Sequence, residues 1–222
     1  MAKKVVIIGG VAAGMKTASR LRRRDKDAEI TVVERGQQVS YGACGFPYYI
    51  GGDVKDFSSF THTPQGFARD AEFFKNVKGF DVVTGHEAQK IDRANKTVTV
   101  MSYDVLVLGT GATPVKLSLP GAELGGIHNF WFPWETLKVK EEMEAYKVTD
   151  VVIVGAGLIG MELAEAFHKQ GLTVNIVEMQ DRILPQMLDL EMADLVKKPL
   201  EKAGIRLYLE EKTLGFEGEN GR

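Results

Sequence analysis

The sequence predicts an α/β protein made of two units of the same kind, placed in tandem along the chain. In the first unit, a β-branched run leads through a glycine turn into an alanine-rich helix and then a second apolar run, "KKVVIIGGVAAGMKTASRLRRRDKDAEITVVERG". The same order returns in "TDVVIVGAGLIGMELAEAFHKQGLTVNIVEM", residues 149–179. A strand, a tight turn, a helix and a second strand form the repeating unit of parallel sheets.

Composition excludes several classes of protein. Hydrophobic residues make up 44% and charged residues 26% of the 222 residues, which is typical of a globular chain that buries a core. The formal net charge of −2 does not favour nucleic-acid binding. Because no apolar run approaches the roughly 20 residues of a membrane span and no signal peptide is seen, we expect a cytoplasmic protein without a membrane partner.

The first glycine turn is typical of a dinucleotide site. Gly9 and Gly14 match the outer positions of the pattern G-x-G-x-x-G, whereas Val11 occupies the position of its middle glycine. Small residues let the backbone N–H groups and the helix N-terminus approach a pyrophosphate. Glu34 ends the next strand, about 20 residues past Gly14, where such sites place an acid for a ribose 2′-OH. Taken alone, a tight connection that binds nothing is the alternative.

The second copy weakens that alternative. Gly155, Gly157 and Gly160 complete the full pattern, and Glu178 ends the strand that follows. Two such units, each with an acid at the strand end, favour two dinucleotide cofactors that exchange electrons. For a nicotinamide cofactor in the second unit, Glu178 favours NADH because its charge would repel the 2′-phosphate of NADPH, although Arg182 leaves NADPH open.

Three further segments carry predictions about structure. Residues 96–121 predict strands that end in a small-residue turn, Thr110-Gly111-Ala112, with an ordinary interdomain loop as the alternative. We also expect helices around residues 64–75 and 136–145. The four scattered histidines and single cysteine predict no metal site.

Together, the segments "IIGGVAAGMKTASRLRRRDKDAEITVVERG", "SYGACGFPYYIGG", "YDVLVLGTGATP" and "VGAGLIGMELAEAF" resemble the pyridine nucleotide-disulfide oxidoreductase family of flavoproteins. The similarity is to its single-cysteine branch, which contains coenzyme A-disulfide reductases, persulfide reductases and NADH oxidases. It implies two Rossmann-like FAD/NAD(P)-binding units: an FAD-binding domain over residues 1–116, a linker region over 117–148 and an NAD(P)H-binding domain over 149–222. It also implies a chain truncated before the returning FAD segment and the dimerisation domain, from a homodimeric parent, so we expect weak flavin binding.

The resemblance implies which residues contact each ligand. The implied FAD contacts are Gly9, Val11, Ala12, Ala13, Gly14, Glu34, Arg35, Ala88, Thr110, Gly111 and Ala112. The implied NAD(P)H contacts are Gly155, Gly157, Leu158, Ile159, Gly160, Glu162 and Glu178. The implied coenzyme A contacts are Arg20, Arg23, Ser40 and Tyr41, with Lys75 as a looser match. Ala43 replaces the asparagine that coenzyme A-disulfide reductases commonly place before the cysteine.

Cys44 is the only cysteine, so it cannot form a disulfide within the chain. By resemblance, reduced flavin passes electrons to Cys44, which forms a mixed disulfide with a small thiol substrate; relatives with two active cysteines are excluded. Pro47 suits the first turn of a helix, and a position just before a helix favours the thiolate. The alternatives are an inert buried cysteine, an NADH oxidase or peroxidase that cycles through a sulfenic acid, and a non-catalytic nucleotide-binding fragment. By resemblance, NADH oxidases and peroxidases tend to have a histidine in the first glycine turn, and its absence here weakens that alternative.

The helix after the first turn carries a basic face. Lys16, Arg20, Arg23 and Arg24 recur at helical spacing, so their side chains share one face that could hold the phosphates of coenzyme A. An ordinary solvated face is the alternative.

Overall fold

The structure is a computed structural model that describes residues 2–99, 101–219 and 221. It contains two compact units. One comprises the residues up to Gly42 together with Phe57–Thr113, and the other comprises Ala43–Asp56 together with the residues from Pro114 onward. These units differ from the predicted domain boundaries, because residues 43–56 and the predicted linker region both pack in the second unit. The assignment of one cofactor to each domain stays a prediction.

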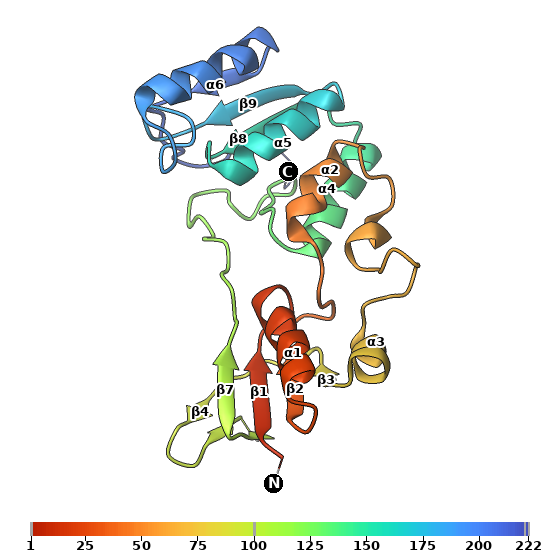
Figure 1. Ribbon diagram of the computed structural model, residues 1–222. Coiled ribbons are helices and arrows are strands. Elements are labelled where there is room, and N and C mark those ends of the chain that lie inside the picture. Colours follow the sequence, from red (N-terminus) through yellow and green to blue (C-terminus); the bar gives the residue numbers. More distant parts are fainter. Residues whose placement is uncertain (1, 100, 220, 222) are drawn as a thin grey trace. The chain divides into compact units, whose positions relative to one another are not determined.

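The first unit is built around a four-stranded parallel sheet with the strand order β3-β2-β1-β7 (Figure 1). Ile8, at the end of the central strand, pairs with Val33 on one side and Leu108 on the other, so these three strands end at the same edge. The strands of this sheet are β1 (Lys4–Ile8), β2 (Glu29–Val33), β3 (Asp81–Val83) and β7 (Val105–Leu108).

The alternation of side chains along β1 explains the two layers of this unit. Val5 and Ile7 pack in the core with residues of α1 (Ala13–Arg24), whereas Val6 and Ile8 pack on the opposite face with Val98. A strand buried on both faces needs a continuous apolar run, as the sequence has. The second face adjoins a small antiparallel sheet, which consists of β4 (Ile91–Asp92), β5 (Thr97–Val98) and β6 (Met101–Ser102).

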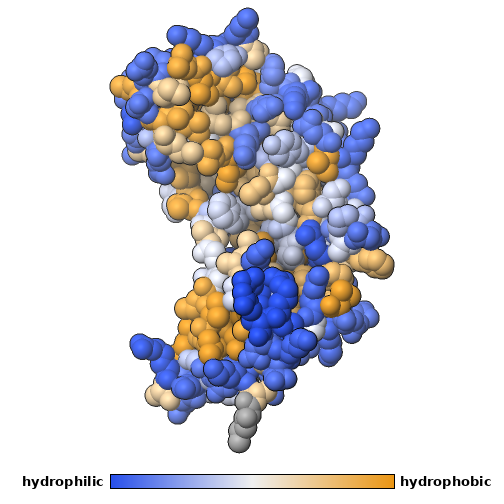
Figure 2. Space-filling model, viewed as in Figure 1, coloured by the Kyte–Doolittle hydropathy of each residue, from blue (hydrophilic) through white to orange (hydrophobic). Residues whose placement is uncertain are grey.

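The second unit repeats the same order of elements. Its three-stranded parallel sheet has the order β10-β9-β8, and its core contains Ile153, Val174 and Ile176. On β8 the alternate residues Val152 and Val154 are exposed. Figure 2 shows apolar residues on the surface of each unit. The strands are β8 (Asp150–Val154), β9 (Thr173–Val177) and β10 (Arg206–Tyr208), and the longer helices are α4 (Pro133–Ala145), α5 (Leu158–Lys169) and α6 (Leu190–Lys202).

Two predicted helices begin elsewhere than expected. The helix predicted around 64–75 starts only at α3 (Ala71–Phe73) and continues as the π-helix η3 (Phe74–Lys78). Asp70 sets this start, because its carboxylate accepts a hydrogen bond from the N–H of Phe73 at 2.8 Å. The helix predicted around 136–145 begins earlier, at Pro133, where Glu135 accepts from the N–H of Phe132 at 2.9 Å.

Within the described part of the chain, no helix combines the length and apolar character needed to cross a membrane. The same residues contain no group of three or more histidine, cysteine, aspartate or glutamate side chains able to hold a metal ion.

Candidate functional site

The first glycine turn joins β1 to α1 and is fixed by close backbone contacts. Gly9 has φ of +106°, and a Cβ atom there would lie 2.0 Å from the carbonyl oxygen of Gly109. A Cβ atom on Gly14 would lie 1.8 Å from the carbonyl oxygen of Gly9. Both positions therefore require glycine. The contact with Gly109 also brings the turn next to Thr110, so the structure brings together the two predicted flavin-binding segments of this unit.

The second glycine turn, between β8 and α5, shares with the first turn the φ of its first glycine and the close contact at its last glycine. Gly155 again has φ of +106°, and a Cβ atom on Gly160 would lie 2.1 Å from the carbonyl oxygen of Gly155. The middle residue, Gly157, contrasts with Gly160, because a Cβ atom on Gly157 would have no heavy atom within 4 Å. The space over Gly157 is open, as the close approach of a pyrophosphate to the backbone requires.

The two acids at the strand ends hold the glycine turns directly. The carboxylate of Glu34 accepts hydrogen bonds from the N–H groups of Gly10 at 2.7 Å and Gly36 at 2.8 Å. Glu178 does the same with Ala156 at 2.8 Å and Gln180 at 2.9 Å. Sequence reasoning assigned these acids only to ribose and missed this role. A carboxylate has about four lone-pair sites, so each acid can bind the turn and still accept a hydroxyl hydrogen bond.

The other predicted cofactor residues lie in both units. In the first unit, Arg35 donates to the hydroxyl of Thr113 at 3.1 Å, and Ala88 packs at the edge of the core beside β5. In the second unit, the first turn of α5 carries Leu158 and Ile159, both exposed, so this helix end is open to a ligand. The remaining predicted positions are Ala12 and Ala13 at the start of α1, Gly111 and Ala112 after β7, and exposed Glu162 on α5.

A hollow of about 330 Å³ in the first unit brings together Ser40, Tyr41 and Lys16. Ser40 has φ of 54°, and its N–H donates to the carbonyl of Gly10 at 2.8 Å, which joins this segment to the first glycine turn. Arg69 also lines the hollow and was missed by sequence reasoning, because no motif surrounds it. Its guanidinium donates to the carbonyl of Phe60, and burial lowers the pKa of Arg69. The other lining residues are Val11, Ala12, Met15, Ser19, Gly42 and Phe74.

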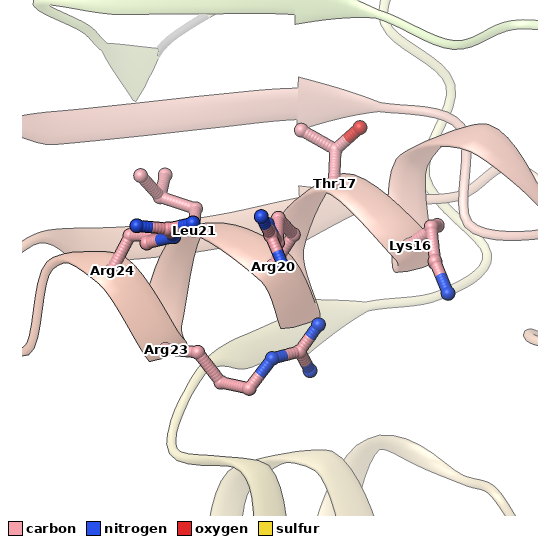
Figure 3. A pocket seen from close by; sticks show the side chains of 6 residues that line it. All are labelled: Lys16, Thr17, Arg20, Leu21, Arg23 and Arg24. Carbon is pink, nitrogen blue, oxygen red and sulfur yellow. The ribbon is translucent and has the colours of Figure 1, made fainter.

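The predicted basic face of α1 lines a second hollow, of about 550 Å³. Figure 3 shows its six side chains along the helix: Lys16, Thr17, Arg20, Leu21, Arg23 and Arg24. This confirms that the four predicted cations share a face, and because Lys16 lines both hollows, the two hollows adjoin. Arg22 does not line this hollow; its guanidinium donates to the carbonyls of Lys26 and Ala28, both at 2.6 Å. Lys75 forms an ion pair with Asp81 at 3.5 Å.

Cys44 lies in the short 3₁₀-helix η1 (Ala43–Gly45), directly before α2 (Phe46–Ile50). Its place before a helix was predicted, and Pro47 is in the first turn of α2 as expected. Cys44 is exposed, so the cysteine is not buried as that alternative expected, whereas its reactivity stays a prediction. Phe46 and Ile50 are buried, and Ile50 belongs to the core of the second unit. The chain thus passes from the first unit, with Ser40 and Tyr41, into the second just before Cys44.

Comparisons with known proteins agree with this geometry. The sequence matches the family described as "Pyridine nucleotide-disulphide oxidoreductase" over residues 3–222. It is 36% identical over 221 residues to the NAD(P)H coenzyme A polysulfide/persulfide reductase of Pyrococcus horikoshii, covering 99% of this chain and 49% of that protein. It is 34% identical over 227 residues to the NADH oxidase of Methanocaldococcus jannaschii, covering 96% of this chain and 49% of that protein.

Among solved structures, the NAD-dependent persulfide reductase from A. fulgidus aligns with a TM-score of 0.94 and 41% identity, covering 99% of this chain and 42% of that one. The chain spans about half the length of the curated relatives it matches. The predicted α/β fold with two Rossmann-like units is confirmed, as is the predicted resemblance. The chain therefore belongs to the pyridine nucleotide-disulphide oxidoreductase family.

Proposed function

We propose that this chain carries the dinucleotide sites and the reactive thiol of an NADH-dependent flavoprotein that reduces coenzyme A disulfide, a persulfide or a related small disulfide. The observation that carries the proposal is the exposed thiol of Cys44, the single cysteine of a chain with two equivalent glycine turns. One protein thiol is enough when the second sulfur arrives with the substrate.

The second glycine turn fits the pyrophosphate of NADH. The open space at Gly157 and the N-terminal end of α5 suit a negatively charged group, because the free N–H groups and the helix dipole point toward it. Glu178 can accept a hydrogen bond from the ribose 2′-OH while it holds the turn, and its charge disfavours a 2′-phosphate. These features support NADH over NADPH.

The first glycine turn fits FAD, which would supply an electron pair to the cysteine sulfur when bound. Gly9 and Gly14 keep β1, α1 and the Thr110 turn close together, and Glu34 is placed to bind a ribose hydroxyl. Arg35 lies beside the same segment through its hydrogen bond to Thr113. These residues would bind and orient FAD.

The two adjoining hollows on the first unit fit a phosphorylated thiol such as coenzyme A. Arg20, Arg23 and Arg24 give several positive charges for phosphate groups, and Ser40 and Tyr41 line the hollow next to them. Lys16 is common to both. A substrate that needs both phosphate binding and a reactive sulfur explains why a basic face and a lone thiol occur in one chain.

The thiol step follows from the chemistry of a mixed disulfide. The thiolate of Cys44 attacks a substrate disulfide, forms an S–S bond to one substrate sulfur and releases the other as a thiol. Two electrons then break the mixed disulfide, so that the second substrate thiol leaves after taking a proton and the thiolate of Cys44 is restored. NADH is the source of these electrons, and the net result is one disulfide reduced per NADH oxidised.

The experiment that tests this proposal measures the absorbance spectrum of the purified chain and its NADH consumption with added FAD. Coenzyme A disulfide is compared with air alone, and Cys44→Ser is the matched control. Disulfide-dependent turnover that the serine variant loses supports the proposal. Turnover with oxygen alone favours an oxidase, the activity named for the M. jannaschii relative. Absence of both flavin and turnover contradicts catalysis by these 222 residues alone. That the whole protein is a homodimer is also a proposal.

A further inference from the structure

The segment that carries Cys44 is bound to the helices of the second unit at several points. The buried side of α2 packs against α5 and α4, and Ile50 is fully buried in the core that contains Leu163 and Phe167. The rings of Phe46 and Phe130 pack edge to face, with their centroids 6.5 Å apart. These apolar contacts place α2 on the unit that also contains the second glycine turn.

Polar side chains secure the end of α2. Lys140 on α4 donates to the carbonyl of Ile50 at 3.4 Å, and Gln170, which follows α5, donates to the carbonyl of Gly51 at 2.7 Å. Carbonyl groups at a helix C-terminus lack partners within the helix, so these bonds satisfy groups that α2 cannot satisfy itself. Lys169 binds both carboxylate oxygens of Asp53, at 3.1 and 3.3 Å. We call Lys140, Lys169 and Gln170 the α2 clamp.

The three contacts differ in strength. The side chains of Lys169 and Asp53 are each 44% exposed, so solvent screens their ion pair and it contributes little. The bond from Lys140 is long at 3.4 Å. Gln170 makes the short bond, at 2.7 Å, and without it the carbonyl of Gly51 loses this hydrogen bond. A Cβ atom on Gly51 would lie 3.3 Å from the Cα atom of Ala166, so α2 and α5 are also close in this region.

We propose that the α2 clamp positions Cys44. The clamp holds the segment that carries the thiol against the C-terminal end of α5, the helix that begins at the second glycine turn. The helix α5 has 12 residues and spans about 17 Å between the turn and the clamp. Since α2 follows η1 without a break, a shift of α2 shifts the sulfur. The importance of this positioning rests on the proposed thiol function, but the positioning itself is a property of the chain.

The test uses the fact that the chain has one cysteine. A nitroxide spin label attached to Cys44 reports the motion of this segment alone, and its spectrum is compared between the unchanged chain and Gln170→Ala. Loss of one net hydrogen bond should raise the ratio of mobile to immobilised label about fivefold. Backbone amide exchange at Gly51 and Gly52 should accelerate by a similar factor. The control is His168→Gln, an exposed position on α5, which should change neither.

Two more variants test the inference from other directions. Gly51→Val keeps all three clamp side chains but adds a side chain that presses against Ala166 and Asp53, and it should mobilise the label as Gln170→Ala does. Lys169→Arg retains the positive charge opposite Asp53 and should leave the spectrum unchanged. An unchanged spectrum and unchanged exchange in folded Gln170→Ala and Gly51→Val would overturn the inference. Neither measurement involves a cofactor or turnover, so its outcome is separate from that of the NADH assay with Cys44→Ser.

Discussion

Replacing Gly157 by alanine should separate nucleotide binding from folding. The backbone of Gly157 has φ of −77° and ψ of −175°, which any residue adopts, and the added methyl group would meet no heavy atom within 4 Å. Alanine at a compatible glycine position stabilises a fold by roughly 0.4–1 kcal/mol, because it restricts the unfolded chain. Gly157 is also the N-cap of α5, where alanine is less favourable than glycine, so the two effects oppose each other and the thermal midpoint of Gly157→Ala should change little.

The same methyl group occupies the space that we assign to the pyrophosphate of NADH. Forcing a group into a well-packed contact costs typically about 1–3 kcal/mol, so we expect the Kd for NADH to rise by about tenfold or more. Binding is measured by titrating NADH fluorescence, and stability by circular dichroism during heating. Gly160→Ala is the matched control: its Cβ atom would lie 2.1 Å from the carbonyl oxygen of Gly155, so this variant should lose stability.

Each possible failure identifies a different error. An unchanged Kd for NADH in a folded Gly157→Ala variant would refute the location of the pyrophosphate. A fall in the thermal midpoint of Gly157→Ala as large as that of Gly160→Ala would refute the open space at Gly157. A normal thermal midpoint in Gly160→Ala would refute the close contact between α5 and the turn.

Three further predictions concern the charged and reactive side chains. Glu178→Gln should narrow the preference for NADH over NADPH, because it removes the charge facing a 2′-phosphate; the ratio of the two Kd values tests this, and an unchanged ratio would contradict it. Arg23→Ala should weaken coenzyme A binding at an unchanged thermal midpoint, whereas Arg22→Ala should cost about 1–3 kcal/mol of stability and leave binding unchanged, because Arg22 donates to backbone carbonyls. Calorimetric titration measures coenzyme A binding and heating measures stability for both variants. Equal effects of the two substitutions on coenzyme A binding would count against the basic hollow as its site. Cys44 should react with one equivalent of a thiol reagent in the folded chain, since its side chain is exposed; protection until unfolding would refute this.

The glycine turns could be predicted from sequence because their requirement is steric and local. Gly9 and Gly155 need positive φ, and Gly14 and Gly160 contact a carbonyl oxygen of their own turn, so the spacing of glycines reports the geometry directly. The shared basic face was predictable for the same reason, since helical spacing alone places Lys16, Arg20, Arg23 and Arg24 together.

Features that depend on distant contacts could not be predicted in this way. The segment 43–56 belongs with the second unit because Ile50 is buried beside residues more than 100 positions later, which no local pattern records. Arg69 reaches its hollow from an irregular loop and has no periodicity to reveal it. The helix expected from residue 64 starts at Ala71 because Asp70 satisfies the N–H of Phe73, and this cap outweighed the broader composition of the segment.

The two acids at the strand ends show why binding and stability are hard to separate in this chain. Glu34 and Glu178 each use both carboxylate oxygens to bind backbone N–H groups of their own loops, and the same oxygens are the ones placed for a ribose. A turn already held in shape loses less entropy when its ligand binds. Removing either acid therefore changes the turn and the ligand contact together. Gly157 is the position where the two effects can be separated, because an added methyl group meets no atom of the fold and lies in the space that we assign to the pyrophosphate.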